Sequence, residues 1–333
     1  MRTLLLRDDQ VKKLLSMSEV IEAVELAFKQ KGLGRVQMPA KLYLYFNKYN
    51  GDLRTMPSYL EELDISAVKI VNVHPDNPSK HKLPTVMAVI ILVDPSTGFP
   101  LAIMGGTTIT DMRTGAAGGI AAKFLARKDS KIVGLVGAGA QARTQLRALF
   151  EVYSKLEEIR VWSRHPEMTR IFLAEAEREY GNLCKFVPED SVRKTAEGAD
   201  IVVTTTPSRE PLVKNDMIVP GMHINCIGAD AIGKEELSPS ILRRAKIVID
   251  DWEQASHSGE INVPLMLRDK IITKDDVWGE IGEIVAGLKP GRVSEDEITV
   301  FTSTGLAVQD AVTAKIAYDK ALQKRIGKFI TMV

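Results

Sequence analysis

A glycine-rich turn near the middle of the chain has the residue types and the spacing of a phosphate-binding loop. Gly137, Gly139 and Ala142 form a GxGxxA pattern directly after the apolar run KIVGLV and before a helix-like stretch. The first glycine permits a tight turn, the second lets a pyrophosphate approach the backbone, and the third small residue lets helix and strand pack closely. The helix N-terminus supplies N–H donors to the phosphates. This context predicts a dinucleotide site, and a tight turn without a ligand is the alternative.

The choice between NAD and NADP depends on the end of the next strand-like segment. This position lies about 20 residues past the glycines, and a carboxylate there binds the ribose 2′-OH of NAD. Here the segment VWSRHP places Ser163 and Arg164 at that position, with no carboxylate. A hydroxyl and a guanidinium suit a 2′-phosphate, because arginine pairs with phosphate through two donors. We expect NAD or NADP, with NADP favoured; the alternative is that Arg164 is a solvated surface residue.

Three further strand-like segments end in small or hydroxyl residues. Ligands bind at the carboxyl ends of strands in a doubly wound sheet, so these ends would line the nicotinamide site. The residues concerned are Thr204, Thr205, Ile227, Gly228, Ala229, Asp230 and Ser303. Asp230 also offers a carboxylate for general acid or base catalysis, the alternative being a turn or helix-cap aspartate. Glu235 and Glu236 are expected to cap the next element.

Among the cations that precede the glycine-rich turn, four are candidates for binding a substrate: Lys41, Arg54, Lys69 and Arg113. Together they would suit a substrate with an anionic carboxylate. Lys69 lies among apolar residues in AVKIVNV, where a lone lysine that points to solvent is the alternative interpretation. A lysine near other cations has a lowered pKa, which would let Lys69 exchange protons near neutral pH.

The elements that must position these residues follow two patterns. Between about 130 and 305, strand-like segments mostly alternate with helix-length stretches: KIVGLVG, EIRVWS, CKFV, DIVVTTT, HINCIG, KIVID and EITVFTS. This rhythm predicts a doubly wound parallel sheet. Up to residue 129, a helix after Ser16 is followed by KLYLYF, AVKIVNV, TVMAVIILVD and FPLAIM, which favours an antiparallel or mixed sheet.

Two helices complete the expected α/β fold. One, from about 111 to 127, is rich in glycine, which indicates close approach by another backbone or a ligand. The other, 306–326, could return to the first domain. We therefore predict a Rossmann domain over 130–305 and an α+β substrate and dimerisation domain made of 1–129 and 306–333.

Composition excludes several classes of protein. The 333 residues contain 44 Lys and Arg against 43 Asp and Glu, so no global field favours nucleic acid or a membrane surface. Two cysteines without a CxxC pair or a His/Cys cluster predict neither a disulfide scaffold nor a metal site. The longest apolar run, Val86–Val93, is too short to span a bilayer, and Leu4–Leu6 is too short for a signal peptide. A cytoplasmic protein is expected.

Seven segments, in order along nearly the whole chain, resemble the ornithine cyclodeaminase/μ-crystallin family. They are Gly51–Pro57, Val68–Pro75, Leu83–Met87, Arg113–Gly118, Gly137–Gln141, Gly228–Asp230 and Ser303–Gly305. Within the family, the chain resembles the archaeal-type alanine dehydrogenases most. The resemblance implies a homodimer in which each chain has a substrate and dimerisation domain and a Rossmann domain.

The resemblance also implies roles for individual residues. Lys69 matches the lysine that contacts the substrate and helps to activate the reacting carbon, and Asp230 matches the catalytic acid/base. Arg113 matches an arginine that reaches the substrate carboxylate and the cofactor, and Lys41 a basic position in the substrate pocket. Cofactor-contacting positions are matched by Thr85, Ala140, Gln141, Thr204, Lys234 and Ser303.

Two positions depart from the family pattern. Cyclodeaminases carry a glutamate where this chain has Arg54. A carboxylate there suits the two amines of ornithine, whereas an arginine suits a small amino or keto acid with a free carboxylate. At Ser163 and Arg164, NAD-dependent relatives carry an acidic residue, so this position leaves the cofactor open.

These observations favour a dehydrogenase that reversibly converts L-alanine, water and NAD(P)⁺ to pyruvate, ammonium and NAD(P)H. One alternative is an ornithine cyclodeaminase, which forms proline and ammonia and recycles its nicotinamide within one turnover. Others are a ketimine reductase of the same family and a non-enzymatic NADPH-binding protein. The enzymatic hypotheses require the ammonium of Lys69 and the carboxyl of Asp230 to meet across an interdomain cleft.

Overall fold

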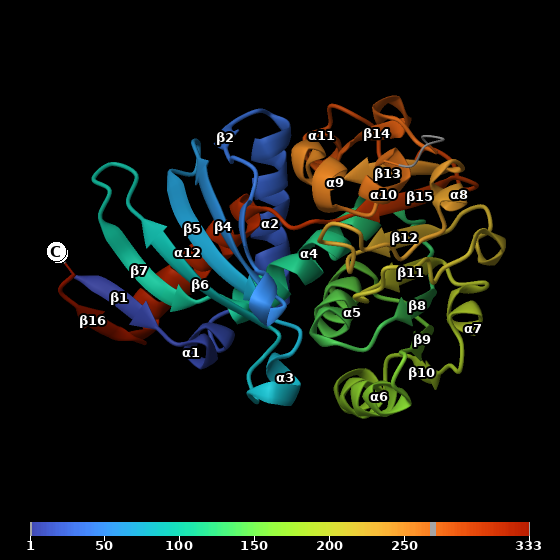
Figure 1. Ribbon diagram of the computed structural model, residues 1–333, viewed down its shortest axis with the longest axis horizontal. Coiled ribbons are helices and arrows are strands. Elements are labelled where there is room, and N and C mark those ends of the chain that lie inside the picture. Colours follow the sequence, from blue (N-terminus) through green and yellow to red (C-terminus); the bar gives the residue numbers. More distant parts are fainter. Residues whose placement is uncertain (1, 267–270, 333) are drawn as a thin grey trace. The chain divides into compact units, whose positions relative to one another are not determined.

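The computed structural model describes residues 2–266 and 271–332. The chain divides into two compact units. Unit 1 contains the residues up to Arg113 together with those from Leu306 onward, and unit 2 runs from Thr114 to Gly305. Figure 1 shows the strands and helices of each unit in sequence colours.

Unit 1 is built on an eight-stranded mixed sheet with the order β16-β1-β7-β6-β5-β4-β2, in which β3 also pairs with β4. β1 runs parallel to β7, and the other pairs are antiparallel. The predicted antiparallel or mixed sheet is therefore confirmed. The strands are β1 (Thr3–Leu6), β2 (Val36–Gln37), β3 (Leu42–Phe46), β4 (Gly51–Leu60), β5 (Ile65–Val73), β6 (Val86–Val93), β7 (Pro100–Gly105) and β16 (Lys328–Ile330).

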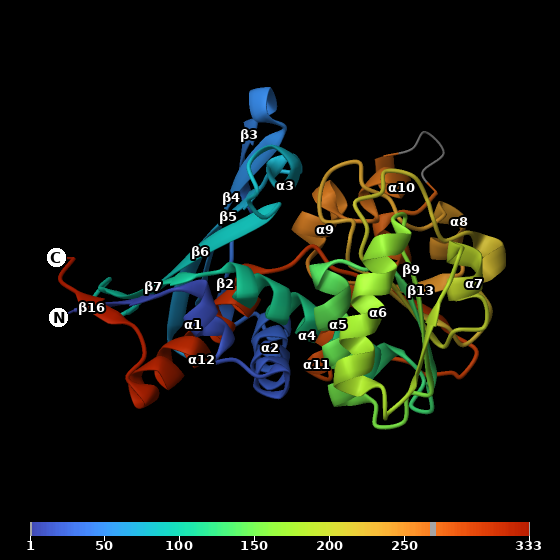
Figure 2. The ribbon, with the colours of Figure 1, turned by 90° about the horizontal axis from the view of Figure 1, so that it is seen from below.

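One face of this sheet is covered by helices from both ends of the chain. The long helix α12 packs on β4, β5 and β6 and against α2 (Figure 2). Alternate strand residues point toward it, and Met56, Val71 and Ala88 form a buried cluster with Ala307. The helices of unit 1 are α1 (Asp8–Lys12), α2 (Met17–Gly32), η1 (Asn47–Tyr49), α3 (Asn77–Lys80) and α12 (Ala307–Lys324).

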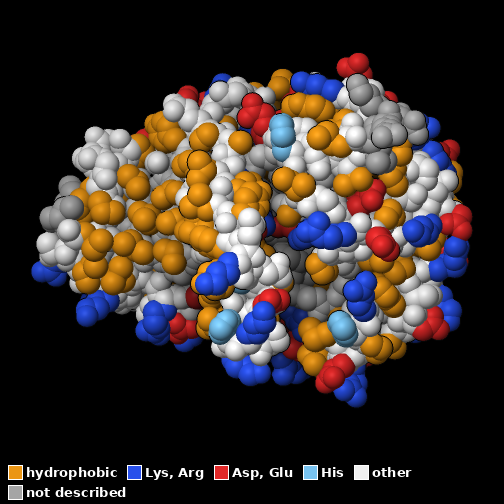
Figure 3. Space-filling view, in the orientation of Figure 1, with side chains coloured by type: hydrophobic (Ala, Val, Ile, Leu, Met, Phe, Trp, Pro, Cys, Tyr) orange, Lys and Arg blue, Asp and Glu red, His pale blue; other side chains and the backbone are white. Residues whose placement is uncertain are grey.

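The other face of the unit 1 sheet is apolar and partly exposed. Its members on β5, β6 and β7 include Val68, Ile70, Val89, Ile91 and Ile103, none of them buried. The outward positions of these three strands carry no charged residue. Figure 3 shows hydrophobic side chains gathered over these strands. Antiparallel sheets that face water normally alternate apolar and polar residues, so this face resembles a buried surface rather than a solvated one.

Unit 2 is a Rossmann-type doubly wound domain, as predicted. Its eight strands are all parallel and have the order β10-β9-β8-β11-β12-β15-β13-β14. They are β8 (Ile132–Val136), β9 (Glu158–Trp162), β10 (Lys185–Pro188), β11 (Ile201–Thr204), β12 (His223–Cys226), β13 (Ala245–Ile249), β14 (Val277–Glu280) and β15 (Ile298–Thr302). The sequence did not predict β14, because VWGE has neither the length nor the apolar run of a buried strand.

The helices of unit 2 lie between these strands. They are α5 (Ala140–Val152), α6 (Pro166–Tyr180), α7 (Val192–Ala196), η2 (Asn215–Met217), α8 (Pro239–Leu242), α9 (Trp252–Ser258), α10 (Asn262–Met266), η3 (Lys274–Asp276) and α11 (Ile281–Val285). Buried apolar side chains fill both faces of the sheet, for example Ile224 on one and Val203 on the other. Among the described residues, no helix is long and apolar enough to cross a membrane.

The helix rich in small residues, α4 (Thr107–Leu125), spans the division between the units. Its residues from Thr114 onward group with unit 2, whereas the sequence analysis assigned everything up to 129 to the first domain. A Cβ atom at Gly115 or Gly118 would collide with Thr144 or Gln145 of α5. The glycines therefore let two helices of unit 2 pack in close contact, which is one of the two expected reasons for them.

Candidate functional site

The strand ends predicted to bind a cofactor form one row along the edge of the unit 2 sheet. The register aligns Trp162, Val136, Thr204, Cys226 and Thr302 across five neighbouring strands. The residues that follow them are Ser163, Gly137, Thr205, Ile227 and Ser303. Backbone bonds of 2.8 to 3.0 Å extend the ladder through this second row, from Gly137 N to Trp162 O through to Ser303 N to Cys226 O.

The order of the strands in the sheet reverses beside β8, the strand that the glycine turn follows. β9 and β10 lie on one side of β8, and β11 and β12 lie on the other. Ligands of doubly wound sheets bind at the carboxyl ends of the strands beside such a switch point. Gly137, after β8, and Thr205, after β11, are the residues at that point.

The two glycines of the turn differ in whether the protein fold itself requires glycine at their positions. Gly137 has φ = 118°, and a Cβ there would collide with the Thr205 hydroxyl. Gly139, the residue that caps the N-terminus of α5, has φ = −86°, and a Cβ there would meet no described protein atom within 4 Å. The protein fold therefore requires glycine at 137 but not at 139, whereas a pyrophosphate against the backbone would require it at 139. Ala140 and Gln141 form the first turn of α5, the part of a helix that binds phosphate.

Ser163 and Arg164 follow β9 but differ in their surroundings. The Ser163 hydroxyl donates to His165 O at 2.8 Å and lies 2.8 Å from the Thr169 hydroxyl, so it is bound at the start of α6. Arg164 is exposed and has no hydrogen bond or ion pair within the described parts of the chain. The exposed position of Arg164 fits both interpretations, a solvated surface residue and an arginine that binds a 2′-phosphate.

A buried carboxylate, Glu236, ties the strand ends together. Its Oε2 accepts from the Thr204 hydroxyl at 2.7 Å and from Gly228 N at 2.9 Å. Its Oε1 accepts from the Thr206 amide at 2.6 Å and the Thr206 hydroxyl at 2.7 Å. Burial raises the pKa of Glu236, and these donated bonds oppose the rise. The expectation that Glu236 caps the next element is wrong, because its carboxylate points back to β11 and β12.

Asp230 lies in the turn that Glu236 holds. Its carboxylate forms an ion pair with Lys234 at 2.5 Å, and Lys234 Nζ also donates to Gly228 O at 3.3 Å. The Asp230 side chain is 34% exposed, so it remains accessible while paired. Ala229 beside it is buried. The predicted catalytic aspartate thus belongs to a turn braced by a neighbouring lysine rather than to a helix cap.

The end of β15 is held by a second buried carboxylate, Asp250. Its Oδ2 accepts from Thr304 N at 2.6 Å, from Gly305 N at 2.7 Å and from the Ser303 hydroxyl at 3.4 Å. The Ser303 side chain is therefore directed toward Asp250, at the end of the adjacent strand β13.

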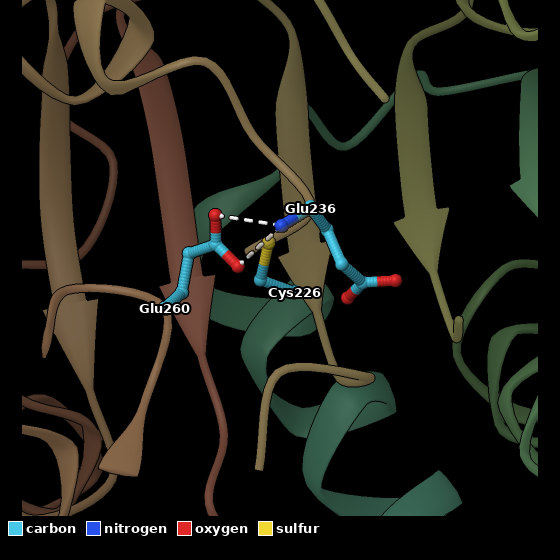
Figure 4. Close-up of side chains that lie close together, drawn as sticks. All are labelled: Cys226, Glu236 and Glu260. Carbon is cyan, nitrogen blue, oxygen red and sulfur yellow. Dashed lines mark hydrogen bonds between the residues drawn. The ribbon is translucent and has the colours of Figure 1, made fainter. Parts of the chain in front are cut away.

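Glu236 also belongs to a cluster with Glu260 and Cys226, whose side-chain atoms lie within 4.8 Å of one another (Figure 4). Glu260 accepts from the backbone nitrogens of Glu236 and Leu237 at 2.7 to 3.1 Å. Burial raises the pKa values of Cys226 and Glu260 well above their ordinary values. The carboxylates of Glu236 and Glu260 accept hydrogen bonds from hydroxyl and backbone donors of the protein. The cluster is structural.

The predicted catalytic lysine lies in unit 1 and is buried. Lys69, on β5, is 1% exposed, so the interpretation that it points to solvent is wrong. Its Nζ lies 2.7 Å from Oδ2 of Asp310, a residue in the first turn of α12. Burial, with Arg113 and Lys41 nearby, lowers the pKa of Lys69 to about 7, and Asp310 opposes that fall. The lowered pKa that the sequence predicted is present, with burial as its largest cause.

Arg113 shares the same carboxylate. Its Nε donates to Oδ1 of Asp310 at 3.1 Å, and its Nη1 donates to Gln309 Oε1 at 3.2 Å. Arg113 is 6% exposed and Asp310 is 1% exposed. Three of the four predicted cations, Lys41, Lys69 and Arg113, therefore interact in one cluster, in which Asp310 is the carboxylate that contacts both Lys69 and Arg113.

Arg54 is buried on β4 and is already paired. Its Nε and Nη2 donate to the two oxygens of Asp52 at 2.9 and 3.1 Å, and its guanidinium lies over the Tyr43 ring, 5.1 Å from the centroid. A role for Arg54 in binding a substrate carboxylate stays a prediction. Thr85 lies just before β6, where its carbonyl accepts from His74 N at 2.8 Å.

Lys69 and Asp230 belong to different units. The expectation that they meet stays a prediction, as do the roles assigned to each site residue. Sequence reasoning missed Asp310 and Asp250, and it assigned Glu236 a capping role in place of its contacts to the strand ends. For Asp310 the available signal was an acidic residue in the first turn of the last helix, and for Asp250 a carboxylate directly after a predicted strand.

The strand order, the glycine turn and the row of strand ends define a Rossmann dinucleotide-binding domain. The model of the ornithine cyclodeaminase/mu-crystallin family matches residues 1–325. The chain is 49% identical to the alanine dehydrogenase of Archaeoglobus fulgidus over 330 residues, which cover 99% of this chain and 98% of the relative. It belongs to the ornithine cyclodeaminase/mu-crystallin family.

Two solved structures share this architecture. An archaeal alanine dehydrogenase dimer with bound NAD has a TM-score of 0.94 and 47% identity, with 100% of both chains covered. The Thermococcus litoralis Δ1-pyrroline-2-carboxylate reductase, in complex with NADH and L-proline, has a TM-score of 0.93 and 44% identity, with 98% of this chain and 100% of that chain covered. The family resemblance identified in the sequence is confirmed.

The Glu236 contacts predict a specific loss of stability. In Glu236→Gln an NH₂ group replaces one acceptor oxygen, so at least one buried donor loses its partner, which costs about 1–3 kcal/mol. We expect a lower midpoint of thermal unfolding, measured by calorimetry. Glu235→Gln is the control, because Glu235 is buried but its Oε1 has no hydrogen-bond partner among the described residues. Equal midpoints for the two variants would contradict this account.

Proposed function

We propose that the protein is an NAD(P)-dependent amino-acid dehydrogenase whose substrate is L-alanine. The reaction converts L-alanine, NAD(P)⁺ and water to pyruvate, ammonium, NAD(P)H and a proton. The observation that carries the proposal is the buried cluster of Lys69, Arg113 and Asp310, because it pairs an amine that titrates near neutral pH with a guanidinium. Similarity to alanine dehydrogenase, both in sequence and in structure, supports the choice of substrate.

The charges of this cluster favour an anionic substrate. Asp310 is one carboxylate in contact with two buried cations, and Lys41 adds further positive potential at Lys69. Buried charges are stable only when paired. The carboxylate of an amino or keto acid would supply the second anion, and it would fix the position of the α-carbon. Positioning of this kind can account for much of a rate enhancement.

Two residues are proposed to handle protons. When bound, the nicotinamide supplies or accepts the hydride. Lys69, whose pKa of about 7 permits either protonation state near neutral pH, would polarise the carbonyl or imine of the substrate. Asp230, accessible and paired with Lys234, would exchange protons with water and with the departing amine.

The substrate is proposed to be small because of Arg54. An ornithine-type substrate presents a second amine, which an arginine would repel. Arg54 and its partner Asp52 place a compact ion pair on β4 instead of a lone carboxylate. A second candidate, reduction of Δ1-pyrroline-2-carboxylate to proline, is favoured by the 44% identity to the Thermococcus litoralis reductase. Both reactions transfer a hydride at the α-carbon of a 2-imino acid.

The cofactor is proposed to be a nicotinamide dinucleotide, with the phosphate preference decided at Arg164. The similar structures hold NAD or NADH. In this chain no carboxylate stands at position 163, and the exposed guanidinium of Arg164 suits a 2′-phosphate. The assay below therefore includes both cofactors.

The test of the function is turnover by the purified full chain. We expect pyruvate and ammonium to oxidise NADH or NADPH, and L-alanine to reduce the oxidised cofactor, followed by absorbance at the reduced-nicotinamide band. Lys69→Met and Asp230→Asn should each lower kcat by about 10²-fold or more, because general acid–base groups contribute about 10²–10⁴-fold. Lys80→Met, at an exposed ion pair with Asp76, is the control.

Each alternative hypothesis has its own outcome in this assay. Proline formed from ornithine without net reduced cofactor would replace the proposal with a cyclodeaminase. Oxidation of NAD(P)H with Δ1-pyrroline-2-carboxylate but not with pyruvate and ammonium would favour the second candidate. Tight NADPH binding without turnover of any amino, imino or keto acid would leave a binding protein.

The glycine turn allows cofactor binding to be tested apart from folding. A side chain at Gly139 meets no described atom of the protein, so Gly139→Val should keep the unfolding midpoint. It should weaken NAD(P)H binding at least about tenfold, measured by nicotinamide fluorescence, because the side chain blocks close approach of the pyrophosphate. Gly137→Ala is the contrast: φ = 118° and the collision with Thr205 should lower the midpoint. Unchanged cofactor affinity in Gly139→Val would reject a pyrophosphate at this turn.

We also propose that the protein is a homodimer that buries the outer face of the unit 1 sheet. On β5, β6 and β7 the face carries apolar residues without charges, with Lys328 of β16 beside Leu5 at its edge, and a solved relative is a dimer. Val89, 44% exposed, lies on β6 within this face. Val89→Lys should give a monomer in light scattering, because an ammonium would be buried without a partner. Leu26→Lys, at a 39% exposed position on α2, should stay dimeric; a dimer for both variants would exclude this face.

A further inference from the structure

Asp310 occupies a position that the proposed reaction does not itself explain. It lies at the start of α12, more than two hundred residues along the chain from Lys69, and is 1% exposed. Its Oδ2 is 2.7 Å from Lys69 Nζ, and its Oδ1 accepts from Arg113 Nε at 3.1 Å. Each oxygen of one carboxylate therefore contacts a different cation that is expected to bind the substrate.

The surroundings of Asp310 fix the orientation of its carboxylate. It lies in the first turn of α12, where the helix dipole favours negative charge. The preceding residue, Gln309, is also buried, and its Oε1 accepts from Arg113 Nη1 at 3.2 Å and from Leu306 N at 2.7 Å. One turn of helix thus supplies two acceptor oxygens to Arg113 and an ion-pair partner to Lys69.

The neighbours of Lys69 show why one carboxylate matters. Its cross-strand partners are Met56 on β4 and Ile90 on β6, neither of which can carry charge. The charged groups that act on Lys69 are Arg113 and Lys41, which disfavour its protonated form, and Asp310, which favours it. Arg54, on the same face of β4 as Met56, is paired with Asp52. Asp310 is therefore the described acidic group that offsets burial and the other cations at Lys69.

We propose that Asp310 is a positioning residue that holds Lys69 and Arg113 in fixed geometry and sets the protonation state in which Lys69 meets the substrate. The effect of removing it has a definite sign. Without the carboxylate, burial and the neighbouring cations act unopposed, so the Lys69 ammonium becomes a stronger acid. The pH limb that Lys69 contributes to activity moves to lower pH, whether Lys69 acts as an acid or as a base.

The proposal rests on the proposed function, and its test uses two readouts. The first is an NMR titration of the full chain labelled with ¹³C at lysine Cε, in which the Lys69 signal is identified by its loss in Lys69→Met. We expect the wild-type amine to titrate near pH 7 and the Asp310→Asn amine at least about one pH unit lower. The second is the pH profile of kcat/KM, whose Lys69 limb should move by the same amount.

Asp319→Asn is the matched control. Asp319 lies on the same helix, pairs with Lys315 at 2.6 Å and is 45% exposed. It should leave the titration and the pH profile unchanged. Asp310→Glu keeps the charge but displaces it by one methylene, so it should restore the titration near pH 7 while kcat stays below wild type. This variant also carries the test if Asp310→Asn does not fold.

The outcomes separate the two ideas. If Lys69 titrates at the same pH in wild type and Asp310→Asn, or if Asp310→Glu has wild-type kcat, the role of Asp310 is overturned while alanine turnover stands. If no amino or keto acid is turned over, the proposed function fails, and the NMR titration alone decides whether Asp310 controls Lys69.

Discussion

The structure of unit 1 depends on the burial of one ammonium beside one carboxylate. A buried, unpaired ammonium costs several kcal/mol, and Lys69 lies on a strand whose flanking residues are apolar. The chain supplies the counter-charge from its last helix, so α12 must return to the sheet and place its first turn over β5. The other oxygen of the same carboxylate pairs with Arg113 and holds its guanidinium in place. One ion-pair network therefore links β5, the helix α4 that carries Arg113, and the C-terminal helix α12.

Unit 2 uses buried carboxylates in a different way. Glu236, Asp250 and Glu260 accept hydrogen bonds from backbone amides or hydroxyls where strands end. Strand ends leave backbone donors that no ladder satisfies, and a carboxylate has enough lone pairs to accept from several of them. Carboxylates at these places keep the turns after β11, β12 and β15 in fixed conformations. Those turns carry Thr205, Asp230 and Ser303, so rigid turns and candidate binding residues coincide.

The sequence predicted features that follow from periodicity and missed features that follow from tertiary contact. All seven strands expected in the second segment are present, because parallel strands buried on both faces form continuous apolar runs. The glycine turn was identifiable from its context. In contrast, β4 was not predicted, since Pro57 and the polar residues around Arg54 hide its alternation, although its buried positions are Arg54, Met56, Ser58 and Leu60. Proline is tolerated there because Pro57 lies between the parts of β4 that pair with β3 and with β2, so this position is locally at a sheet edge.

The same distinction separates the site residues that the sequence identified from those that depend on tertiary contacts. Lys69 and Asp230 were singled out by residue type at a strand and a strand end, and the family resemblance assigned their roles. Asp310 and Glu236 could not be found in this way, because a carboxylate in a helix or loop is normally a solvated residue. What distinguishes them is the set of donors that the fold brings to them: an ammonium and a guanidinium for Asp310, and hydroxyls and amides for Glu236. A charged partner makes a carboxylate responsive to the protonation of that partner, whereas neutral donors only hold it in place. The two carboxylates are equally buried, yet only Asp310 is able to couple pH to the chemistry of a neighbouring side chain.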